Sequence, residues 1–136
     1  MELQVGVKAL LANKEGKYLL VRRSSKKYPE VGARWDIVGG RINPGETLME
    51  NLRREVKEEV NLEIRNDPKL VAAQDILRVP GRHVVRLTFV GEADGTPHLD
   101  DDHTEFKWVT AEDMRGMENL DIYVKELIEK KILLNW

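Results

Sequence analysis

The sequence predicts one domain of the α/β (α+β) class, a sandwich in which a mixed β-sheet lies between helices. Three observations predict it. Short apolar or alternating segments, typical of strands, occur before residue 40 and again after residue 68. A segment with helical periodicity separates these two groups, and a second one ends the chain. The length of 136 residues suits one hydrophobic core, so we treat residues 1–136 as a single domain.

The sequence of residues 5–23 predicts a β-hairpin. Apolar residues alternate over residues 5–11, as in a half-buried strand, and the turn sequence NKEGK leads to the apolar run YLLVRR. The polar segment 24–34 contains Pro29 and Gly32 and predicts a loop. WDIV, residues 35–38, predicts a short strand that ends at the pair Gly39 and Gly40.

A helix is predicted to begin near Thr47. The sequence TLME places Glu50 three residues after Thr47, the pattern in which each side chain bonds the other residue's free backbone N–H. Apolar residues then recur every fourth position and predict the buried face of this helix: Leu48, Leu52, Val56 and Val60.

The second half predicts another hairpin, a loop, a strand and a helix. Residues 69–79 and 83–93 are strand-like and are joined by a PGR turn. Residues 94–105 form a polar, acid-rich loop, and FKWV, residues 106–109, forms a short strand. Residues 120–134 have amphipathic periodicity and predict a C-terminal helix with Asp121 as its cap. The histidines, which lack metal-ligand spacing, are interpreted as surface or loop residues: His83, His98 and His103.

The composition excludes several function classes. With 22 basic and 24 acidic residues, the chain has no overall charge bias toward a nucleic acid polymer or an acidic membrane. It contains no cysteine, which excludes a disulfide framework, a thiolate metal site and a cysteine nucleophile. The N-terminal segment is unlike a signal peptide, and no membrane-spanning segment is predicted. We therefore expect a soluble, cytoplasmic protein.

Three acidic residues of the predicted helix form a cluster. At 3.6 residues per turn, Glu55 and Glu59 lie one turn apart, and Glu58 lies between them on the same side. Like charges at this spacing repel each other, so a bound divalent cation is a natural partner. Carboxylate oxygens favour Mg²⁺ or Mn²⁺. The alternative is a solvated helix face with salt bridges, which is the commoner case for a charged helix.

The segment around this cluster resembles the signature of the Nudix (MutT-like) hydrolases, G-x5-E-x7-R-E-U-x-E-E-x-G-U, where U is aliphatic. Gly40 is followed at the family spacing by Glu46 and by REVKEEVNL, residues 54–62. One fixed position differs: Asn61 stands where the family has glycine. Asparagine tolerates the left-handed backbone that this helix end requires, so we expect activity to survive. WDIVGG and EFKWVT also resemble family segments.

The resemblance implies an α-β-α sandwich of the Nudix type, with the mixed sheet between helices. It implies hydrolysis of a nucleoside diphosphate linked to another moiety, with Mg²⁺ as the usual cofactor and Mn²⁺ as a substitute. The partner is then a small nucleotide. Dimers are common in the family, which leaves a homodimer open.

The resemblance also implies roles for individual residues. The metal ligands would be Glu55, Glu58 and Glu59, with the carbonyl of Gly40 as a further ligand. Glu46 would support them, and Arg54 would orient them. Metal ions would neutralise the diphosphate, lower the pKa of a bound water and stabilise the leaving phosphate.

The general base and the substrate contacts stay open at this point. Glu58 or Glu59 is one choice of base, and Glu105, with Asp102 behind it, is the other. Phosphate contacts are predicted for arginines beside the strands. Trp35 is either a stacking partner for a base or a core residue. The predicted substrate-binding residues are Arg22, Arg23, Trp35 and Arg41.

Three functions compete. The first is a pyrophosphohydrolase acting on ADP-ribose, a nucleotide sugar or a (deoxy)nucleoside triphosphate, and the segments 24–34 and 77–83 would decide among these. The second is a catalytically inactive nucleotide sensor, which would have no reason to retain mutually repelling glutamates. The third is an isomerase of the isopentenyl diphosphate type, which depends on a cysteine that this chain lacks.

Overall fold

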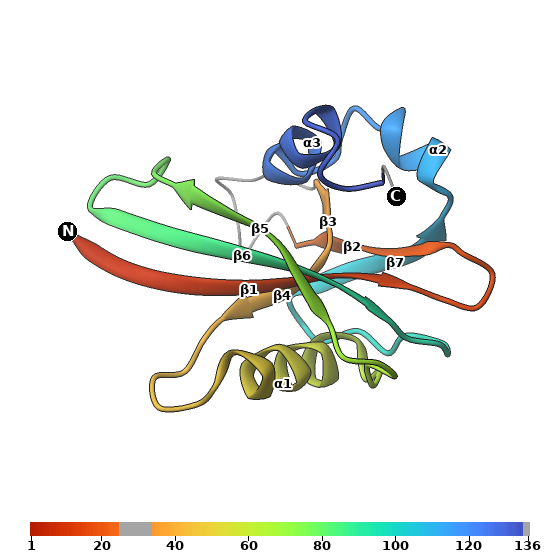
Figure 1. Cartoon of the computed structure of the whole chain (residues 1–136), viewed down its shortest axis with the longest axis horizontal. Helices are drawn as coiled ribbons and strands as arrows, with labels where there is room; N and C mark the ends of the chain where they lie inside the picture. The colour runs from red at the N-terminus through yellow and green to blue at the C-terminus, as the bar shows by residue number, and fades with distance from the viewer. Residues whose placement is uncertain (25–33, 135–136) are drawn as a thin grey trace.

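A computed structural model describes residues 1–24 and 34–134 of the chain. Its centre is a seven-stranded sheet. Helix α1 (Leu48–Val60) covers one face of the sheet, and α2 (Ala111–Arg115) and α3 (Ile122–Glu129) cover the other, as Figure 1 shows. The predicted sandwich of a sheet between helices is confirmed.

The sheet is built around its longest strands. β1 (Glu2–Ala12) pairs in parallel with β6 (Arg82–Glu92) along its whole length. On its other side, β1 pairs antiparallel with β4 (Val38–Arg41) and, at its end, with β2 (Tyr18–Arg23). The remaining strands extend the sheet antiparallel: β5 (Lys69–Ile76) beside β6, and β3 (Trp35–Asp36) and β7 (His103–Val109) beside β2. The mixture of one parallel pairing with antiparallel pairings makes the sheet mixed.

Both predicted hairpins are present, but some boundaries differ from the prediction. The predicted strand WDIV is two strands, β3 and β4, separated at Ile37, and β4 continues through both glycines. β7 begins at His103 instead of residue 106, because its first residues pair with the end of β2. Glu105 therefore lies in a strand and not in a loop. The predicted loop at 24–34 lies mostly outside the described residues.

The helices on the second face also differ from the prediction. α2 was not predicted; Thr110 caps it, in a reciprocal pair with Asp113. α3 is capped by Asp121, as predicted, but it ends at Glu129, well before residue 134. Lys131 has a φ of 60°, a left-handed conformation that a helix cannot continue through.

Helix α1 follows the sequence prediction closely. The Thr47 hydroxyl accepts from the Glu50 N–H, and the Glu50 carboxylate accepts from the Thr47 N–H. Asn61 ends the helix with φ 55°, the left-handed conformation expected where the family signature has glycine. The prediction is wrong at Leu48, which is 38% exposed and lies outside the hydrophobic cluster that contains Leu52, Val56 and Val60.

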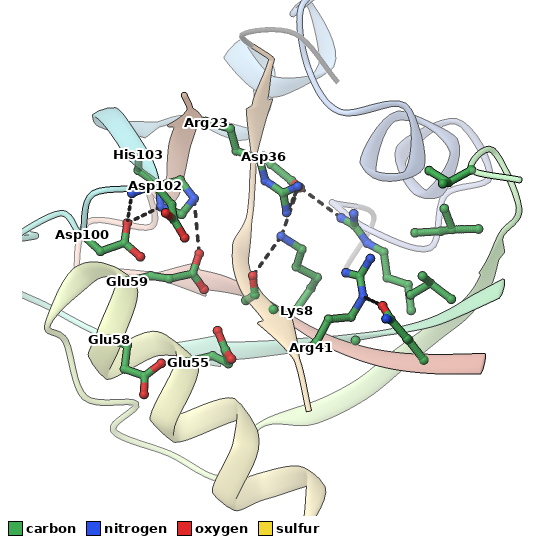
Figure 2. A pocket seen from close by; sticks show the side chains of 18 of the residues that line it. Lys8, Arg23, Asp36, Arg41, Glu55, Glu58, Glu59, Asp100, Asp102 and His103 are labelled. Carbon is green, nitrogen blue, oxygen red and sulfur yellow. Dashed lines mark hydrogen bonds and ion pairs between the residues drawn. The ribbon is translucent and has the colours of Figure 1, made fainter. Parts of the chain in front are cut away.

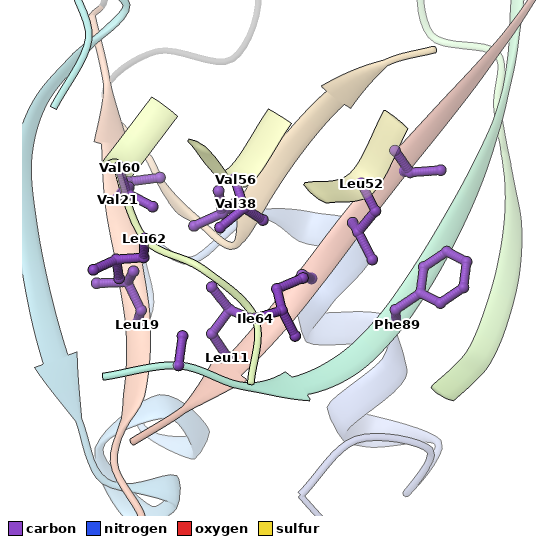
Figure 3. Close-up of a cluster of buried hydrophobic side chains, with 13 residues drawn as sticks. Leu11, Leu19, Val21, Val38, Leu52, Val56, Val60, Leu62, Ile64 and Phe89 are labelled. Atoms are coloured by element: carbon purple, nitrogen blue, oxygen red, sulfur yellow. The ribbon is translucent and has the colours of Figure 1, made fainter. Parts of the chain in front are cut away.

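Two hydrophobic clusters hold the layers together. The first packs α1 on the sheet through Leu52, Val56 and Val60, as Figure 3 shows. The second packs α2 and α3 on the opposite face. Residues on β1 alternate between the clusters, so Ala9 faces the first and Leu10 the second. The sheet is buried on both faces here, and α1 is packed against one of them.

Candidate active site

A cavity of about 470 Å³ opens beside β4 and the C-terminal half of α1 (Figure 2). Its lining comes from strands β1 to β4 and β6, from α1, from the β5–β6 turn and from the segment that leads into β7. A volume of this size suits a nucleotide-sized ligand. The predicted residues that line it are Arg23, Gly40, Arg41, Glu55, Glu58, Glu59 and Asp102.

Two glycines of β4 allow close approaches, Gly39 to β1 and Gly40 to α1. Gly39 has a φ of 142°, and a Cβ there would lie 2.0 Å from the carbonyl oxygen of Val7. At Gly40, a Cβ would lie 2.5 Å from Oε2 of Glu55. Only glycine fits either position without displacement. The Glu55 carboxylate consequently lies directly against the bare backbone of Gly40.

Arg54 connects several of the predicted carboxylates. Its Nη1 lies 2.9 Å from Glu55 Oε1 and 3.3 Å from Glu58 Oε2, and its Nε lies 3.6 Å from Glu46 Oε1. Nη2 donates to Asn51 Oδ1 over 2.7 Å. The structure thus places the guanidinium where it can orient Glu55 and Glu58.

Asn51 was missed by the sequence analysis. It is fully buried, and its amide nitrogen donates to the carbonyls of Glu46 and Thr47. Its Oδ1 accepts from the backbone N–H of Asn43 as well as from Arg54. One side chain therefore joins the turn before α1 to the arginine. Its position among charged neighbours on the helix gave no sign of burial.

Glu59 is the buried member of the acidic cluster. It is 6% exposed, whereas the side chain of Glu58 is 59% exposed. Burial raises the pKa of Glu59 to about 8. Repulsion from Glu55 and Asp100 also raises this pKa, whereas attraction to Lys8 opposes the increase. Its Oε2 has no hydrogen-bond partner among the described residues. A buried carboxylate oxygen without a partner is costly, which indicates that a ligand is missing there.

The interpretation of the histidines is wrong for His103. Its side chain is 4% exposed, and Nε2 lies 3.3 Å from Glu59 Oε1. Nδ1 lies 2.7 Å from Asp100 Oδ1 (Figure 2). Burial lowers the pKa of His103, and the bond to Asp100 opposes that change. The acid-rich context DDDHTE suggested solvent exposure, so the sequence did not reveal this contact.

A buried group of charges lies at the back of the cavity. Asp36 lies 3.1 Å from both Lys8 Nζ and Arg86 Nη2, and 3.5 Å from Arg23 Nη2. Burial alone would raise the pKa of Asp36, but Arg86, Lys8 and Arg23 together hold it well below its usual range. Lys8 also donates to the carbonyls of Ile37 and Gly39, and burial with two nearby arginines lowers its pKa to about 8.

The same group reaches α3. Arg86 Nη1 lies 3.2 Å from Asp121, whose carboxylate caps that helix. The sequence analysis did not identify Lys8, Asp36 or Arg86 as site residues. A signal was present, because each is a charged residue inside an otherwise apolar strand segment, VGVKALLA, WDIV and HVVRLTFV. A charge in such a run is buried and must be paired.

The β5–β6 turn supplies a further wall of the cavity. Arg78 comes from this turn, Arg82 is the first residue of β6 and Arg41 ends β4, and the apolar residues Ile76, Val79 and Val84 also line the cavity. The Arg82 Nε is buried and has no hydrogen-bond partner in the described part of the chain. Arg41 Nε donates to Gln4 Oε1 over 2.7 Å. These guanidinium groups suit phosphate oxygens, and the apolar residues suit a flat ring.

Five predicted residues lie outside the lining of this cavity: Glu46 and Arg54, which pair with each other beside it, and Arg22, Trp35 and Glu105. Glu105 is exposed and lies 3.7 Å from Arg22. Trp35 is 6% exposed and belongs to the second hydrophobic cluster, with Lys107 Nζ 4.3 Å from its ring centroid. The structure therefore brings Glu58 and Glu59 to the cavity and leaves Glu105 outside it.

The donor chemistry at the acidic end fits a hard divalent cation. Glu59 Oε2 is buried and has no hydrogen-bond partner among the described residues, and the Glu55 carboxylate lies against the backbone of Gly40. No set of three His, Cys, Asp or Glu side chains is already gathered as a metal site over residues 1–24 and 34–134. Arg54 contacts one oxygen each of Glu55 and Glu58.

Within the described ranges, no helix has the length and apolar character needed to cross a membrane.

Comparison with known proteins relates the whole described fold to one family. A family model described as NUDIX domain matches residues 2–130. The MutT protein from Methanosarcina mazei Go1 has a similar crystal structure, with a TM-score of 0.84, 30% identity, and coverage of 95% of this chain and 92% of that one. A MutT NUDIX hydrolase from Burkholderia pseudomallei shares the fold, with a TM-score of 0.79, 24% identity, and coverage of 95% and 98%.

One curated relative carries a substrate in its name. The Mycobacterium tuberculosis protein named "Putative 8-oxo-dGTP diphosphatase 2" is 31% identical over 90 residues. The match covers 66% of this chain and 63% of that protein's length.

Proposed function

Since the chain belongs to the Nudix hydrolase family, we propose that it is a metal-dependent pyrophosphohydrolase that releases a nucleoside monophosphate from a nucleotide. The observation that carries this proposal is that acidic and basic side chains line different parts of one cavity. Glu55, Glu58 and Glu59 occupy one end, and six basic residues are among those that line the remainder: Lys8, Arg23, Arg41, Arg78, Arg82 and Arg86. A diphosphate with a bound metal ion carries negative charge on its oxygens and positive charge on the metal, so it matches both the basic residues and the glutamates of the cavity.

The metal would be held by oxygen ligands from α1 and β4. We assign Glu55 and Glu59 as carboxylate ligands and the Gly40 carbonyl as a further one. Mg²⁺ is the expected ion, with Mn²⁺ as a substitute, because the donors are all oxygen. When bound, the metal would neutralise the diphosphate oxygens and acidify a water. Arg54, supported by Glu46 and Asn51, would hold the carboxylates in orientation.

The reaction would be attack of water on one phosphorus of the diphosphate. The bond from that phosphorus to the bridging oxygen breaks, and the bridging oxygen leaves with the remainder of the substrate. We assign Glu58 as the residue that accepts the water's proton, because its carboxylate is the exposed one of the cluster. Glu105 is less suited, because it lies outside the cavity lining and faces Arg22.

The basic residues would bind the phosphates. Arg23, Lys8 and Arg41 all line the cavity, and Figure 2 shows Lys8 between the two arginines. Positive charge beside a phosphoryl group stabilises the negative charge that develops in the transition state. Trp35 is more suited to its packing role than to stacking on a base, because its ring is buried beneath Lys107.

We propose a nucleoside triphosphate as the substrate class, with an oxidised purine deoxynucleotide such as 8-oxo-dGTP as the first compound to test. The name of the M. tuberculosis relative supports this choice. Ile76, Val79 and Val84 supply an apolar wall for a base, and the arginines at the β5–β6 turn supply phosphate contacts. ADP-ribose and nucleotide sugars are the alternative substrates.

The proposal is tested by measuring product release from 8-oxo-dGTP, the common (d)NTPs, ADP-ribose, nucleotide sugars and dinucleoside polyphosphates. Each is assayed with Mg²⁺, with Mn²⁺ and with EDTA. We expect metal-dependent release of a monophosphate, and loss of at least about 100-fold in kcat for Glu58→Gln. No product release from any compound of the panel, combined with tight nucleotide binding, would instead indicate the inactive sensor.

A further inference from the structure

The segment that precedes β7 is joined to the end of α1 by backbone hydrogen bonds. The N–H of His98 donates to the carbonyl of Val60 over 2.9 Å, and the N–H of Asp100 donates to the carbonyl of Glu59 over 3.1 Å. These are carbonyls of the last helical turn, which have no partner within the helix. Pairing with them fixes the distance between Glu59 and the segment 98–103.

The other end of this segment is fixed to β2. The N–H of Ser24 donates to the carbonyl of Asp102 over 2.9 Å, and His103 pairs with Arg23 as the first residue of β7. His103 is thus held between α1 and the sheet. Its ring has little freedom to leave the contact with Glu59.

Asp100 sets the orientation of the His103 ring. Its Oδ1 lies 2.7 Å from Nδ1 of His103 and also accepts from the N–H of Asp102 over 3.2 Å. A carboxylate that accepts from Nδ1–H directs the other ring nitrogen away from itself, and that nitrogen can donate to a second, ionised carboxylate only as an imidazolium N–H. Here that other nitrogen, Nε2, lies 3.3 Å from Oε1 of Glu59.

Glu59 is held by only one of its two oxygens. Oε1 contacts His103, whereas Oε2 is buried and without a hydrogen-bond partner in the described ranges. If the pair served only to stabilise the fold, the unpaired oxygen would be a net cost. The arrangement is explained if the histidine holds one oxygen so that the other is directed to a ligand.

We propose that His103 and Asp100 are positioning residues, which hold Glu59 through Oε1 and leave Oε2 ready to bind the metal. This inference rests on the proposed function, since it takes Glu59 as a ligand. Partners that orient a ligating side chain in this way typically change metal affinity 10- to 100-fold when removed. Neither residue needs to touch the substrate for this role.

The test measures Mn²⁺ binding to the protein without nucleotide, by calorimetry, for the parent protein and for His103→Ala, His103→Gln and Asp100→Asn. His98→Gln is the matched control, because His98 lies in the same segment with an exposed side chain. We expect the first and third variants to bind Mn²⁺ at least about 10-fold more weakly. The glutamine variant should be intermediate, because its amide can still bond Oε1, and the control should match the parent.

Two further measurements separate positioning from other roles. If Asp100 acts through His103, the double variant should bind Mn²⁺ no more weakly than His103→Ala alone, because the two effects are not additive. At saturating Mn²⁺, kcat of His103→Ala should return to within about threefold of the parent, because the loss lies in metal affinity.

Several outcomes would overturn the inference. The first is an unchanged Mn²⁺ affinity in folded His103→Ala. The second is a low kcat of this variant at saturating Mn²⁺ together with normal Mn²⁺ affinity, because that result would make His103 a group that touches the substrate. If His103→Ala does not fold, Asp100→Asn decides, since that side chain is partly exposed. A parent protein that binds no Mn²⁺ would contradict the proposed function itself, which is a different result.

Discussion

A Cβ on Gly40 would lie 2.5 Å from Oε2 of Glu55, so the absence of a side chain at this position is what lets the glutamate carboxylate rest against β4. Gly40 and Glu55 are separated in the sequence by the turn before α1, and the fold brings them together. The contact links the glycine pair to the acidic cluster, and it leads to a first prediction.

Gly40→Ala should lower kcat by at least about 10-fold while changing the free energy of unfolding by less than about 1 kcal/mol. The added methyl group must displace the Glu55 carboxylate, which can move because it is the end of a flexible side chain. Steady-state kinetics and urea unfolding check this. Gly116→Ala is the control, because a Cβ there meets its nearest atoms at 3.8 Å in ordinary contact. Full activity in Gly40→Ala would contradict the role given to Glu55.

The burial of Glu59 predicts a pH-dependent stability in the absence of metal. Its pKa is raised from 4.5 to about 8, so the folded state binds a proton that the unfolded state has released. Stability therefore falls as pH rises toward 8. The lowered pKa of His103 opposes this change only up to about one unit above 6.5, where the unfolded histidine becomes neutral as well. Between pH 6.5 and 8 the loss should reach up to about 2 kcal/mol.

Glu59→Gln should remove this dependence and match or exceed the parent's stability at pH 8 in EDTA. Thermal unfolding of both proteins at several pH values measures it, and Glu58→Gln is the matched control on an exposed neighbour. A Glu59→Gln profile parallel to the parent's would show that Glu59 is ionised over this range. The same variant should lose hydrolytic activity, because a ligand is replaced.

Asp36→Asn should destabilise the fold by roughly 3 to 5 kcal/mol. The carboxylate balances Lys8, Arg23 and Arg86 in a buried setting, and an amide would leave these cations uncompensated. Denaturant unfolding measures the change. Glu126→Gln, which breaks an exposed pair with Lys130, should cost less than about 1 kcal/mol. Similar small losses for both variants would refute the interpretation of the buried group.

Arg82→Ala should raise KM for the nucleotide about 10-fold with little change in kcat. Arg82 lines the cavity from the start of β6, away from the glutamates, and its unpaired Nε is available to a ligand. A contact made equally in the ground state and the transition state changes KM alone. Arg65→Ala is the control, because Arg65 pairs with Asp94 at the surface. An unchanged KM for Arg82→Ala would place the ligand elsewhere in the cavity.

Local patterns predicted much of the fold. The cap at Thr47, the left-handed Asn61 and the two hairpins depend on residues close in sequence, and all were predicted. The errors occurred where a distant partner decides the structure. β7 begins at His103 because Arg23 pairs with it, and no local signal marks that start.

The sequence by itself determined the family, the sandwich fold and the face on which Glu55, Glu58 and Glu59 project. Helix geometry repeats every 3.6 residues, so the spacing of the glutamates sets their common direction before any tertiary contact forms. Tertiary structure alone decided which of them is buried. It also decided that His103 contacts Glu59 and that Lys8 and Arg86 meet at Asp36. These contacts depend on the register between strands and on the docking of α1, which bring together residues far apart in the chain.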